Sequence, residues 1–187
     1  PLDPAPGNRH LPAMSNTTPA AKPHVHLGAD HFDQVAREWD ENPAFRDRAE
    51  RIAAAIRAAV PLDGSQRALE FGAGTGLLSF ALRDGLGEVV LTDTSPGMLA
   101  VAQERIAALG LQHWTARLLD LTREPPPDER FDLVCSSLAL HHVPDTAGIL
   151  RVFRRLLNPG GWLCVADLDR EDGSFHGVEV DVHHGFD

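Results

Sequence analysis

The stretch Glu70-Phe71-Gly72-Ala73-Gly74-Thr75-Gly76 begins within a short, mostly apolar run, Ala68–Phe71, and precedes a helical pattern. Glycines suit this turn because the chain must reverse sharply and bring its backbone close to a ligand. In an open α/β sheet the turn lies at the carboxyl edge of the strands, where ligands bind. The spacing is G-x-G-x-G, and Leu77 stands where dinucleotide sites have their third glycine. The stretch therefore predicts a ligand-binding turn and counts against NAD.

Strand and helix patterns alternate along the chain on both sides of this turn. The predicted strands are nearly continuous apolar runs, which is typical of a parallel sheet covered on both faces. Asn42 is the predicted N-cap of a helix with Pro43 at its first position. The pattern predicts an α/β fold with a doubly wound, mostly parallel sheet. The predicted strands are Ala68–Phe71, Glu88–Thr92, His113–Leu119, Phe131–Ser137 and Trp162–Asp167, and the predicted helices are His31–Trp39, Pro43–Val60, Leu77–Asp84, Pro96–Leu109 and Thr146–Leu157.

Composition restricts the partners and the compartment. The chain has 187 residues, enough for one domain with a sizeable core, and a formal net charge of −10. That charge argues against a nucleic-acid backbone or an anionic membrane surface as the main partner. Cys135 and Cys164 each lie in an apolar, strand-like run and cannot form a disulfide framework. We therefore expect a protein of the reducing cytoplasm.

The N-terminal 30 residues differ from the rest of the chain. They hold six of the 14 prolines and little apolar periodicity, so we expect a disordered tail over residues 1–30. The chain does not begin with Met, whereas Met14 opens a typical start, so residues 1–13 are interpreted as vector-derived or as an over-long gene start. The predicted folded domain is 31–187.

Two further acidic residues come at the ends of predicted strands. Asp93 ends the second strand, where a carboxylate can accept hydrogen bonds from both hydroxyls of a ribose. Asp120 ends the third strand, where it would meet the edge of an adenine. Each could instead be an ordinary turn or cap aspartate. Together with Glu70 they place three acidic residues around one glycine-rich turn, which predicts a nucleoside site.

These residues, taken in order, resemble a known superfamily. Residues 70–76, then Leu91-Thr92-Asp93-Thr94-Ser95-Pro96-Gly97-Met98, then Asp120, are similar to class I S-adenosylmethionine-dependent methyltransferases. The stretches Phe131–Asp145 and Leu156–Trp162 resemble later motifs of the same superfamily. The resemblance covers roughly 31–187. It implies a Rossmann-like methyltransferase fold, S-adenosylmethionine as cofactor, and a small-molecule acceptor.

The resemblance also implies roles for individual residues. Glu70 and the glycine-rich loop would hold the methionine part of the cofactor, Asp93 the ribose, and Met98 one face of the adenine. Phe32 and Trp39 lie in a segment similar to N-terminal helices that close over the cofactor, although simple helix packing explains them equally well. The implied cofactor-binding set is Glu70, Gly72, Ala73, Gly74, Gly76, Asp93, Thr94, Met98, Asp120, Leu121, Ser136 and Leu138.

The histidines allow weaker predictions. Three pairs are spaced like metal ligands: His24 and His26, His141 and His142, and His183 and His184. None has a cysteine or carboxylate partner at zinc-like spacing, so no metal site is predicted. His141 and His142 follow the fourth strand and are weak candidates for a general base, so no catalytic residue is assigned. His176 and His184 lie in stretches that resemble a subgroup of bacterial methyltransferases, which implies a place on the substrate side.

The C-terminal end departs from the superfamily pattern. After the fifth strand this superfamily adds a helix and an antiparallel strand pair, whereas only 20 residues follow Asp167. The fifth strand would then be a bare apolar edge, which natural sheets avoid. We therefore expect that the antiparallel pair is lacking, either because the chain is C-terminally truncated or because a second chain covers the edge.

The function predicted from the sequence is methyl transfer from S-adenosylmethionine to a small molecule. Two alternatives remain, an NAD-dependent oxidoreductase and a methyltransferase-like binding subunit without catalysis. Leu77 and Asp120 count against the first, and an intact cofactor site counts against the second. No nucleic-acid or membrane partner is predicted, and the oligomeric state is left open, with a dimer among the options.

Overall fold

A computed structural model describes residues 28–176 and 182–187 of the chain. Five strands form one sheet in the order β3-β2-β1-β4-β5, and every neighbouring pair is parallel. The order reverses between β1 and β4, so the predicted doubly wound α/β fold is confirmed. The strands are β1 (Arg67–Phe71), β2 (Glu88–Asp93), β3 (Trp114–Leu118), β4 (Phe131–Ser137) and β5 (Leu157–Ala166).

The helices begin and end close to their predicted bounds. The Asn42 side chain accepts a hydrogen bond from the Ala44 amide at 3.0 Å, and Pro43 opens the helix, which confirms the predicted cap. The first helix begins at Ala29, slightly before the predicted domain boundary. The helical segments are α1 (Ala29–Trp39), α2 (Pro43–Ala59), α3 (Leu77–Leu82), α4 (Pro96–Ala108) and α5 (Thr146–Leu156), with short 3-10 turns η1 (Arg83–Gly85) and η2 (Leu140–His142).

The fifth strand begins earlier than predicted. The sequence predicts a strand from Trp162, whereas β5 starts at Leu157, directly after α5. Leu157 pairs with Phe131 and Trp162 with Leu133, so the register between β4 and β5 shifts here and the extra residues lie on β5. The intervening Pro and Gly residues indicate a loop in the sequence, but a bulge accommodates them within the strand because Gly160 adopts a φ of +81°.

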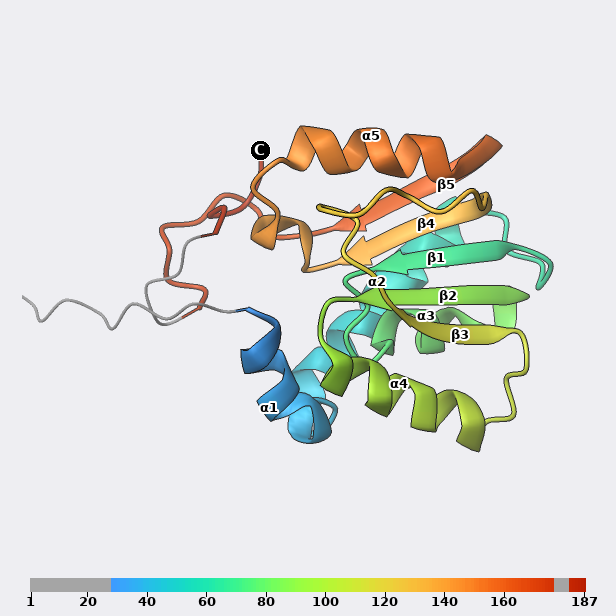
Figure 1. The fold of residues 1–187 in the computed structure, drawn as a ribbon, viewed down its shortest axis with the longest axis horizontal. Helices are drawn as coiled ribbons and strands as arrows, with labels where there is room; N and C mark the ends of the chain where they lie inside the picture. Colours follow the sequence, from blue (N-terminus) through green and yellow to red (C-terminus); the bar gives the residue numbers. More distant parts are fainter. Residues whose placement is uncertain (1–27, 177–181) are drawn as a thin grey trace, which may run out of the picture.

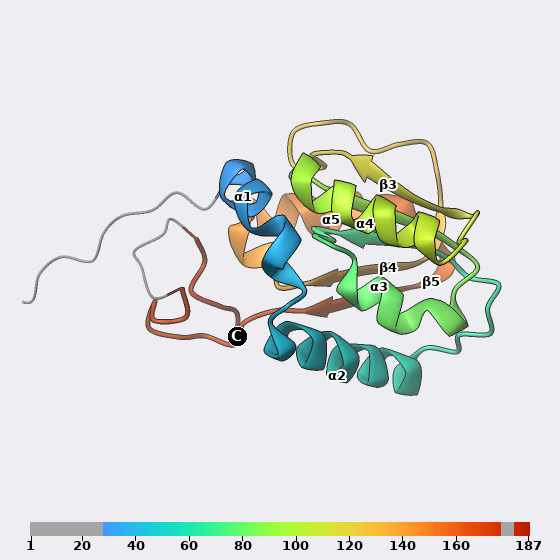
Figure 2. The same ribbon diagram turned by 90° about the horizontal axis from the view of Figure 1, so that it is seen from below.

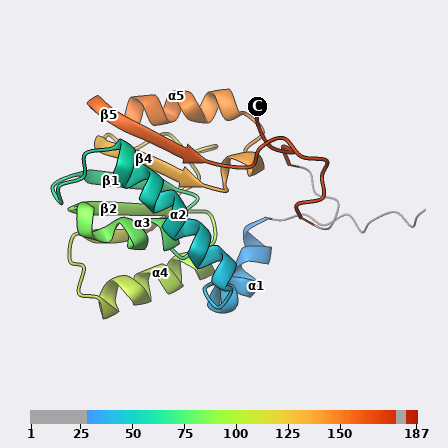
Figure 3. The same cartoon turned by 180° about the vertical axis from the view of Figure 1, so that it is seen from behind.

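Apolar side chains cover both faces of the sheet. One cluster joins α2, α3 and α4 to one face, where the buried ring of Phe80 stacks on Trp114 with centroids 5.3 Å apart. The second joins α5 to the other face, where Phe71 and Phe153 meet edge to face at 5.2 Å. Figure 3 shows α2 crossing one face of the sheet, with α5 along β5. The two covered faces explain why the middle residues of the central strands, such as Val89–Leu91 and Leu133–Cys135, are apolar and buried.

The carboxyl ends of the strands meet α1 and the C-terminal segment. Both lie at the end of the sheet to which the strand arrows point (Figures 1 and 2). Asp33 on α1 accepts hydrogen bonds from the Ser95 hydroxyl at 2.6 Å and the Gly97 amide at 2.7 Å, at the start of α4. These bonds attach α1 to the start of α4, at the carboxyl end of β2.

The β5 edge of the sheet exposes apolar side chains. Trp162, Leu163 and Val165 are 44%, 39% and 41% exposed. The expectation that further structure or a second chain covers this edge stays a prediction. None of the helices in the described part combines the length and apolar character that a bilayer crossing requires.

Candidate functional site

A cavity of about 610 Å³ opens at the carboxyl ends of β1, β2 and β4, beneath α1 and the start of α2. Residues from segments far apart in sequence converge on it, as expected for the crevice at a reversal of strand order. Most of the predicted cofactor-binding residues line it: Glu70, Gly72, Ala73, Gly74, Asp93, Thr94, Met98, Asp120 and Leu138. Phe32, Trp39 and His142 line it as well.

The glycine-rich turn lets the backbone reach the cavity. Gly72 has a φ of +62°, and a Cβ added there would lie 2.3 Å from the Cβ of Ala139. Gly76 has a φ of +82° and lies against Leu91 and Phe80 at the N-terminus of α3. Neither position accepts a side chain, because of the left-handed backbone and the lack of space. The turn is therefore built for close approach, with Gly76 behind the cavity wall.

Glu70 is a buried carboxylate at the end of β1. Its side chain lines the cavity yet is only 2% exposed, and its Oε2 accepts hydrogen bonds from the Ser79 amide at 3.0 Å and hydroxyl at 2.5 Å. Burial, with a smaller contribution from the charge of Asp93, raises its pKa to about 7 against the lowering effect of the two Ser79 hydrogen bonds. No cation within the described ranges forms an ion pair with Glu70. The site thus holds a carboxylate that a bound cation would stabilise.

Asp93 is a second mostly buried carboxylate, at the end of β2. Its Oδ2 accepts from the Gly74 amide at 2.7 Å, and its Oδ1 accepts from the Ser95 amide at 2.9 Å. Burial raises its pKa, backbone hydrogen bonds lower it, and the charge of Asp33 raises it, with a net rise. Asp93 therefore orders the glycine-rich turn and also adds negative charge to the cavity.

Asp120 and its neighbours occupy the far wall of the cavity. The Asp120 Oδ1 accepts from the Thr122 amide at 3.0 Å and hydroxyl at 2.5 Å, which is the turn role that the sequence left open. Its side chain nevertheless lines the cavity beside Arg123. Leu121 is only 2% exposed and belongs to the core rather than to the lining. The predicted role of Leu121 would therefore involve its backbone alone.

The segment after β4 forms another wall. Leu138 lines the cavity with a φ of +55°, a strained conformation for a residue with a side chain. Its amide donates to the Ala166 carbonyl at 2.8 Å, which fixes the turn against β5. Ser136 lies behind this wall, 1% exposed, and its Oγ has no partner among the described residues.

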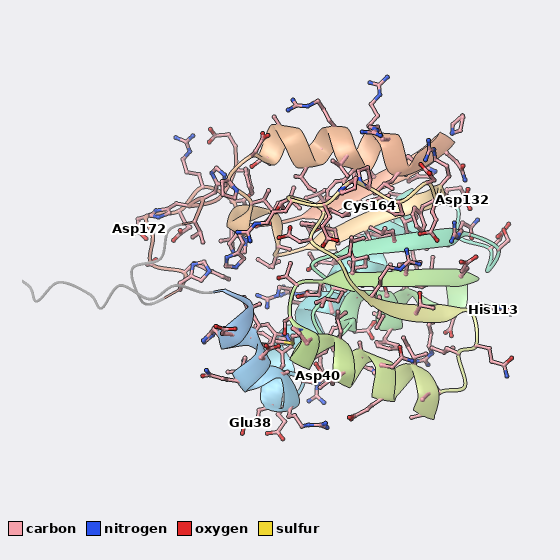
Figure 4. The ribbon with its side chains drawn as sticks, viewed as in Figure 1. Glu38, Asp40, His113, Asp132, Cys164 and Asp172 are labelled. Atoms are coloured by element: carbon pink, nitrogen blue, oxygen red, sulfur yellow. The ribbon has the colours of Figure 1, made fainter. Side chains whose placement is uncertain are left out.

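An aromatic cover closes one side of the cavity. The Phe32 ring meets Trp39 edge to face at 5.9 Å, and Trp39 meets Phe45 at 4.5 Å. Asp40 attaches this cover to the turn below, because it accepts from the Thr75 hydroxyl at 2.5 Å and pairs with Arg105 at 3.4 Å. Figure 4 shows Asp40 between α1 and α4.

Sequence reasoning missed several residues of the lining. Thr75, Ala139, Phe45 and Arg48 all line the cavity. Thr75 and Ala139 lie within or beside recognised motifs and could have been included by adjacency. Arg48 supplies a cation near the cavity, and its guanidinium lies 5.0 Å from the centre of the Phe45 ring. No spacing in the sequence marks it, because α2 reaches the site only through the tertiary fold.

The histidines gather beside the cavity. His141 is 2% exposed, and its Nδ1 lies 2.6 Å from the Asp167 Oδ1. Burial raises the pKa of Asp167, but bonds from His141 and from the Leu168 and Leu140 amides outweigh it and hold that pKa below its usual value. Asp167 is therefore ionised, and it accepts a hydrogen bond from Nδ1–H of His141.

The remaining predicted histidines differ in position. His142 lines the cavity, and its pKa is lowered to about 4, first by burial and then by the charges of His141 and His176. His176 lies beside both, and its pKa is lowered mainly by burial. His184 is exposed, lies against Gly173 and does not line the cavity. His24 and His26 lie outside the described residues.

Comparison with known proteins identifies the domain. Residues 69–163 match the family described as "Methyltransferase domain". The chain is 39% identical over 149 residues to the biotin biosynthesis bifunctional protein BioCD of Bordetella avium, covering 76% of this chain and 30% of that protein. It is 34% identical over 143 residues to trans-aconitate 2-methyltransferase of Methylobacterium nodulans, covering 74% and 53%.

A solved structure agrees with the sequence relatives. The DhpI–SAH complex superposes with a TM-score of 0.59 at 29% identity, covering 72% of this chain and 64% of that one. The chain spans about half or less of the length of the two relatives named above. The matched residues include the end of β1, the glycine-rich turn and the strand ends that carry the acidic residues. The chain belongs to the methyltransferase domain family of the class I S-adenosylmethionine-dependent superfamily.

Proposed function

We propose that this chain carries the cofactor-binding domain of an S-adenosylmethionine-dependent methyltransferase that acts on a small molecule. The supporting observation is a pair of buried carboxylates, Glu70 and Asp93, at one cavity beside a glycine-rich turn. Burial raises the pKa of both groups, and neither forms an ion pair within the described residues, so a bound cation would stabilise their charged forms. A zwitterionic sulfonium nucleoside supplies such positive charge together with hydroxyls for hydrogen bonding.

The cavity residues fit the parts of that cofactor. Glu70 is placed to accept hydrogen bonds from an ammonium group, and Arg48 to pair with a carboxylate. Asp93 is suited to the ribose hydroxyls, and Asp120 to the polar edge of the adenine. Met98, whose sulfur would lie 3.9 Å from a Cβ at Gly74, offers an apolar surface to the ring. DhpI, a related protein, has been solved in complex with SAH, which supports a nucleoside of this kind as the ligand.

The chain's contribution to the reaction is alignment and exclusion of water. S-adenosylmethionine, when bound, supplies a methyl group on a sulfonium leaving group. Phe32 and Trp39 cover the cavity and keep water from the reacting atoms. His142 is neutral near pH 7 because of its lowered pKa, which also makes it a weak base. A role for His141 or His142 in accepting a proton stays a prediction.

The acceptor is proposed to be a small molecule for two reasons. The net charge of −10 disfavours nucleic acid, and trans-aconitate 2-methyltransferase is a relative whose name specifies a small acceptor. We also propose a cytoplasmic location, which suits the free thiols Cys135 and Cys164. The oxidoreductase alternative gains no support, because Leu77 occupies the position of the third glycine.

Calorimetry with separate ligands tests the cofactor assignment. We expect S-adenosylmethionine and S-adenosylhomocysteine to bind and NAD not to bind. A screen of small acceptors with methyl-labelled cofactor then tests transfer. Binding of NAD without S-adenosylhomocysteine would overturn the proposal, and cofactor binding with no transfer to any acceptor would favour the non-catalytic subunit.

A further inference from the structure

Three imidazoles converge at the border between the cavity and the C-terminal segment. One nitrogen from each of His141, His142 and His176 lies within 4.8 Å of the other two. The ring centroids are 4.1 Å apart for His141 and His142, 5.3 Å for His141 and His176, and 5.6 Å for His142 and His176. Sequence spacing marked His141 and His142 as a pair but not the third member, because His176 joins them from the segment after β5.

The buried member of the cluster is held in a defined orientation. The ionised Asp167 accepts a hydrogen bond from the Nδ1–H of His141, and its two oxygens also accept from the Leu140 and Leu168 amides at 2.8 Å. Because Nδ1 donates its hydrogen bond to Asp167, Nε2 is the nitrogen of His141 that remains able to coordinate a metal ion. A carboxylate behind a histidine in this way is the usual outer shell of a metal-ligating imidazole.

The chemical state of the cluster suits a cation. Three protonated imidazoles with ring centroids 4.1 to 5.6 Å apart would repel one another strongly, so this geometry favours neutral rings. Neutral imidazole is the form that binds metal ions. Simple ring packing could also bring three histidines together, but it would not require a carboxylate clamp on the buried ring.

The position of the cluster gives it access to the cavity. His142 lines the cavity and meets the Phe32 ring of the cover at 5.8 Å. Glu171, whose charge acts on His176, lies on the same C-terminal segment. An ion held by the three imidazoles would therefore lie beside the cavity.

We propose that His141, His142 and His176 form a binding site for one divalent transition-metal ion of the Zn²⁺ type. A tetrahedral ion with ligands at about 2.1 Å needs nitrogens roughly 3.4 Å apart, so His176 must move slightly inward on its loop. Three protein ligands leave a fourth position open, as in catalytic rather than structural zinc sites. Asp167 is a positioning residue for His141.

The open position also specifies a class of acceptor. This step rests on the proposed methyltransferase function: the acceptor would carry an oxygen ligand, such as a phenol, hydroxyl or carboxyl group. Coordination would lower the pKa of a hydroxyl and hold its oxygen beside the cavity that Glu70 and Asp93 line. The metal site itself does not depend on this consequence.

The test is titration of the untagged, chelator-stripped chain with Co²⁺, followed by displacement with Zn²⁺. We expect one equivalent of Co²⁺ to give the visible bands of a low-symmetry site, and Zn²⁺ to remove them. His176→Ala and His142→Ala should each weaken binding by more than about 100-fold, because losing a ligand costs more than losing an outer-shell partner. Asp167→Asn should weaken it on the order of 10- to 100-fold.

Matched variants control for other histidines. His113→Ala removes an exposed histidine at the opposite end of the sheet (Figure 4) and should leave Co²⁺ binding unchanged. The double variant His24→Ala/His26→Ala tests the N-terminal pair and should also bind normally. His176→Cys should retain binding and add a near-ultraviolet thiolate-to-cobalt band, which separates loss of a ligand from loss of fold.

Two results would overturn the metal site: no stoichiometric Co²⁺ binding by the unaltered chain, or equal binding by His176→Ala. Calorimetry with S-adenosylhomocysteine on the same samples keeps the two proposals apart. Nucleoside binding without Co²⁺ binding refutes only the metal site. Co²⁺ binding without nucleoside binding refutes only the proposed methyltransferase function.

Discussion

The buried carboxylate of Glu70 makes the stability of the ligand-free chain depend on pH. Its pKa is about 7 in the folded chain against 4.5 for an ordinary glutamate, because burial disfavours the charged form. A pKa unit corresponds to about 1.4 kcal/mol, so this shift amounts to about 3 kcal/mol. The substitution that isolates this effect is Glu70→Gln, which keeps the shape of the side chain and removes its titration.

The direction in which stability changes with pH follows from the number of protons bound in the folded and unfolded states. Below pH 4.5 Glu70 is protonated in both states, and its full contribution to stability is present. Between 4.5 and about 7 the folded state binds more protons than the unfolded state, so stability falls as pH rises. Above about 7 the contribution is lost, and the Gln variant should then be more stable than the unaltered chain by up to about 3 kcal/mol.

Urea unfolding of both proteins between about pH 5 and pH 8 measures this difference, because other titrating groups cancel. Glu41→Gln alters an exposed carboxylate and should follow the unaltered chain at every pH. The same Glu70→Gln variant should bind S-adenosylhomocysteine more weakly, since it lacks the negative charge that faces an ammonium group. Parallel stability profiles for the Gln variant and the unaltered chain would refute the reasoning.

Three further substitutions test the turn, the ribose site and the core. Gly72→Ala should destabilise the chain more than Gly110→Ala, because both have positive φ but only Gly72 also meets Ala139 at 2.3 Å; thermal melting that ranks them equally would contradict the steric argument. Asp93→Ala should weaken S-adenosylhomocysteine binding by about 1–3 kcal/mol in calorimetry, and unchanged affinity would mean that the ribose lies elsewhere. Phe153→Ala should lower the free energy of unfolding by about 3–5 kcal/mol, since Phe153 is fully buried between α5 and the sheet. Nucleoside affinity should be retained, and a loss of affinity without a loss of stability would contradict this expectation.

Much of the fold could be predicted from local patterns. The cap formed by Asn42 and Pro43 depends on residues adjacent in sequence, and it was predicted correctly. The start of β5 at Leu157 was not predicted, because pairing with Phe131 overrides the local preference of Pro and Gly for a loop. Pairing of this kind depends on a neighbouring strand that the local sequence does not specify.

The sequence by itself determined the parallel α/β architecture and the acidic residues around the glycine-rich turn. Both are encoded by periodicity and by short motifs at strand ends, which remain at the same sheet edge whatever the details of packing. Only the tertiary structure decided that Leu121 is buried in the core, that Arg48 reaches the cavity, and that Glu70 lacks a cationic partner among the described residues. It also decided that His176 meets His141, because burial and long-range contact depend on how distant segments pack.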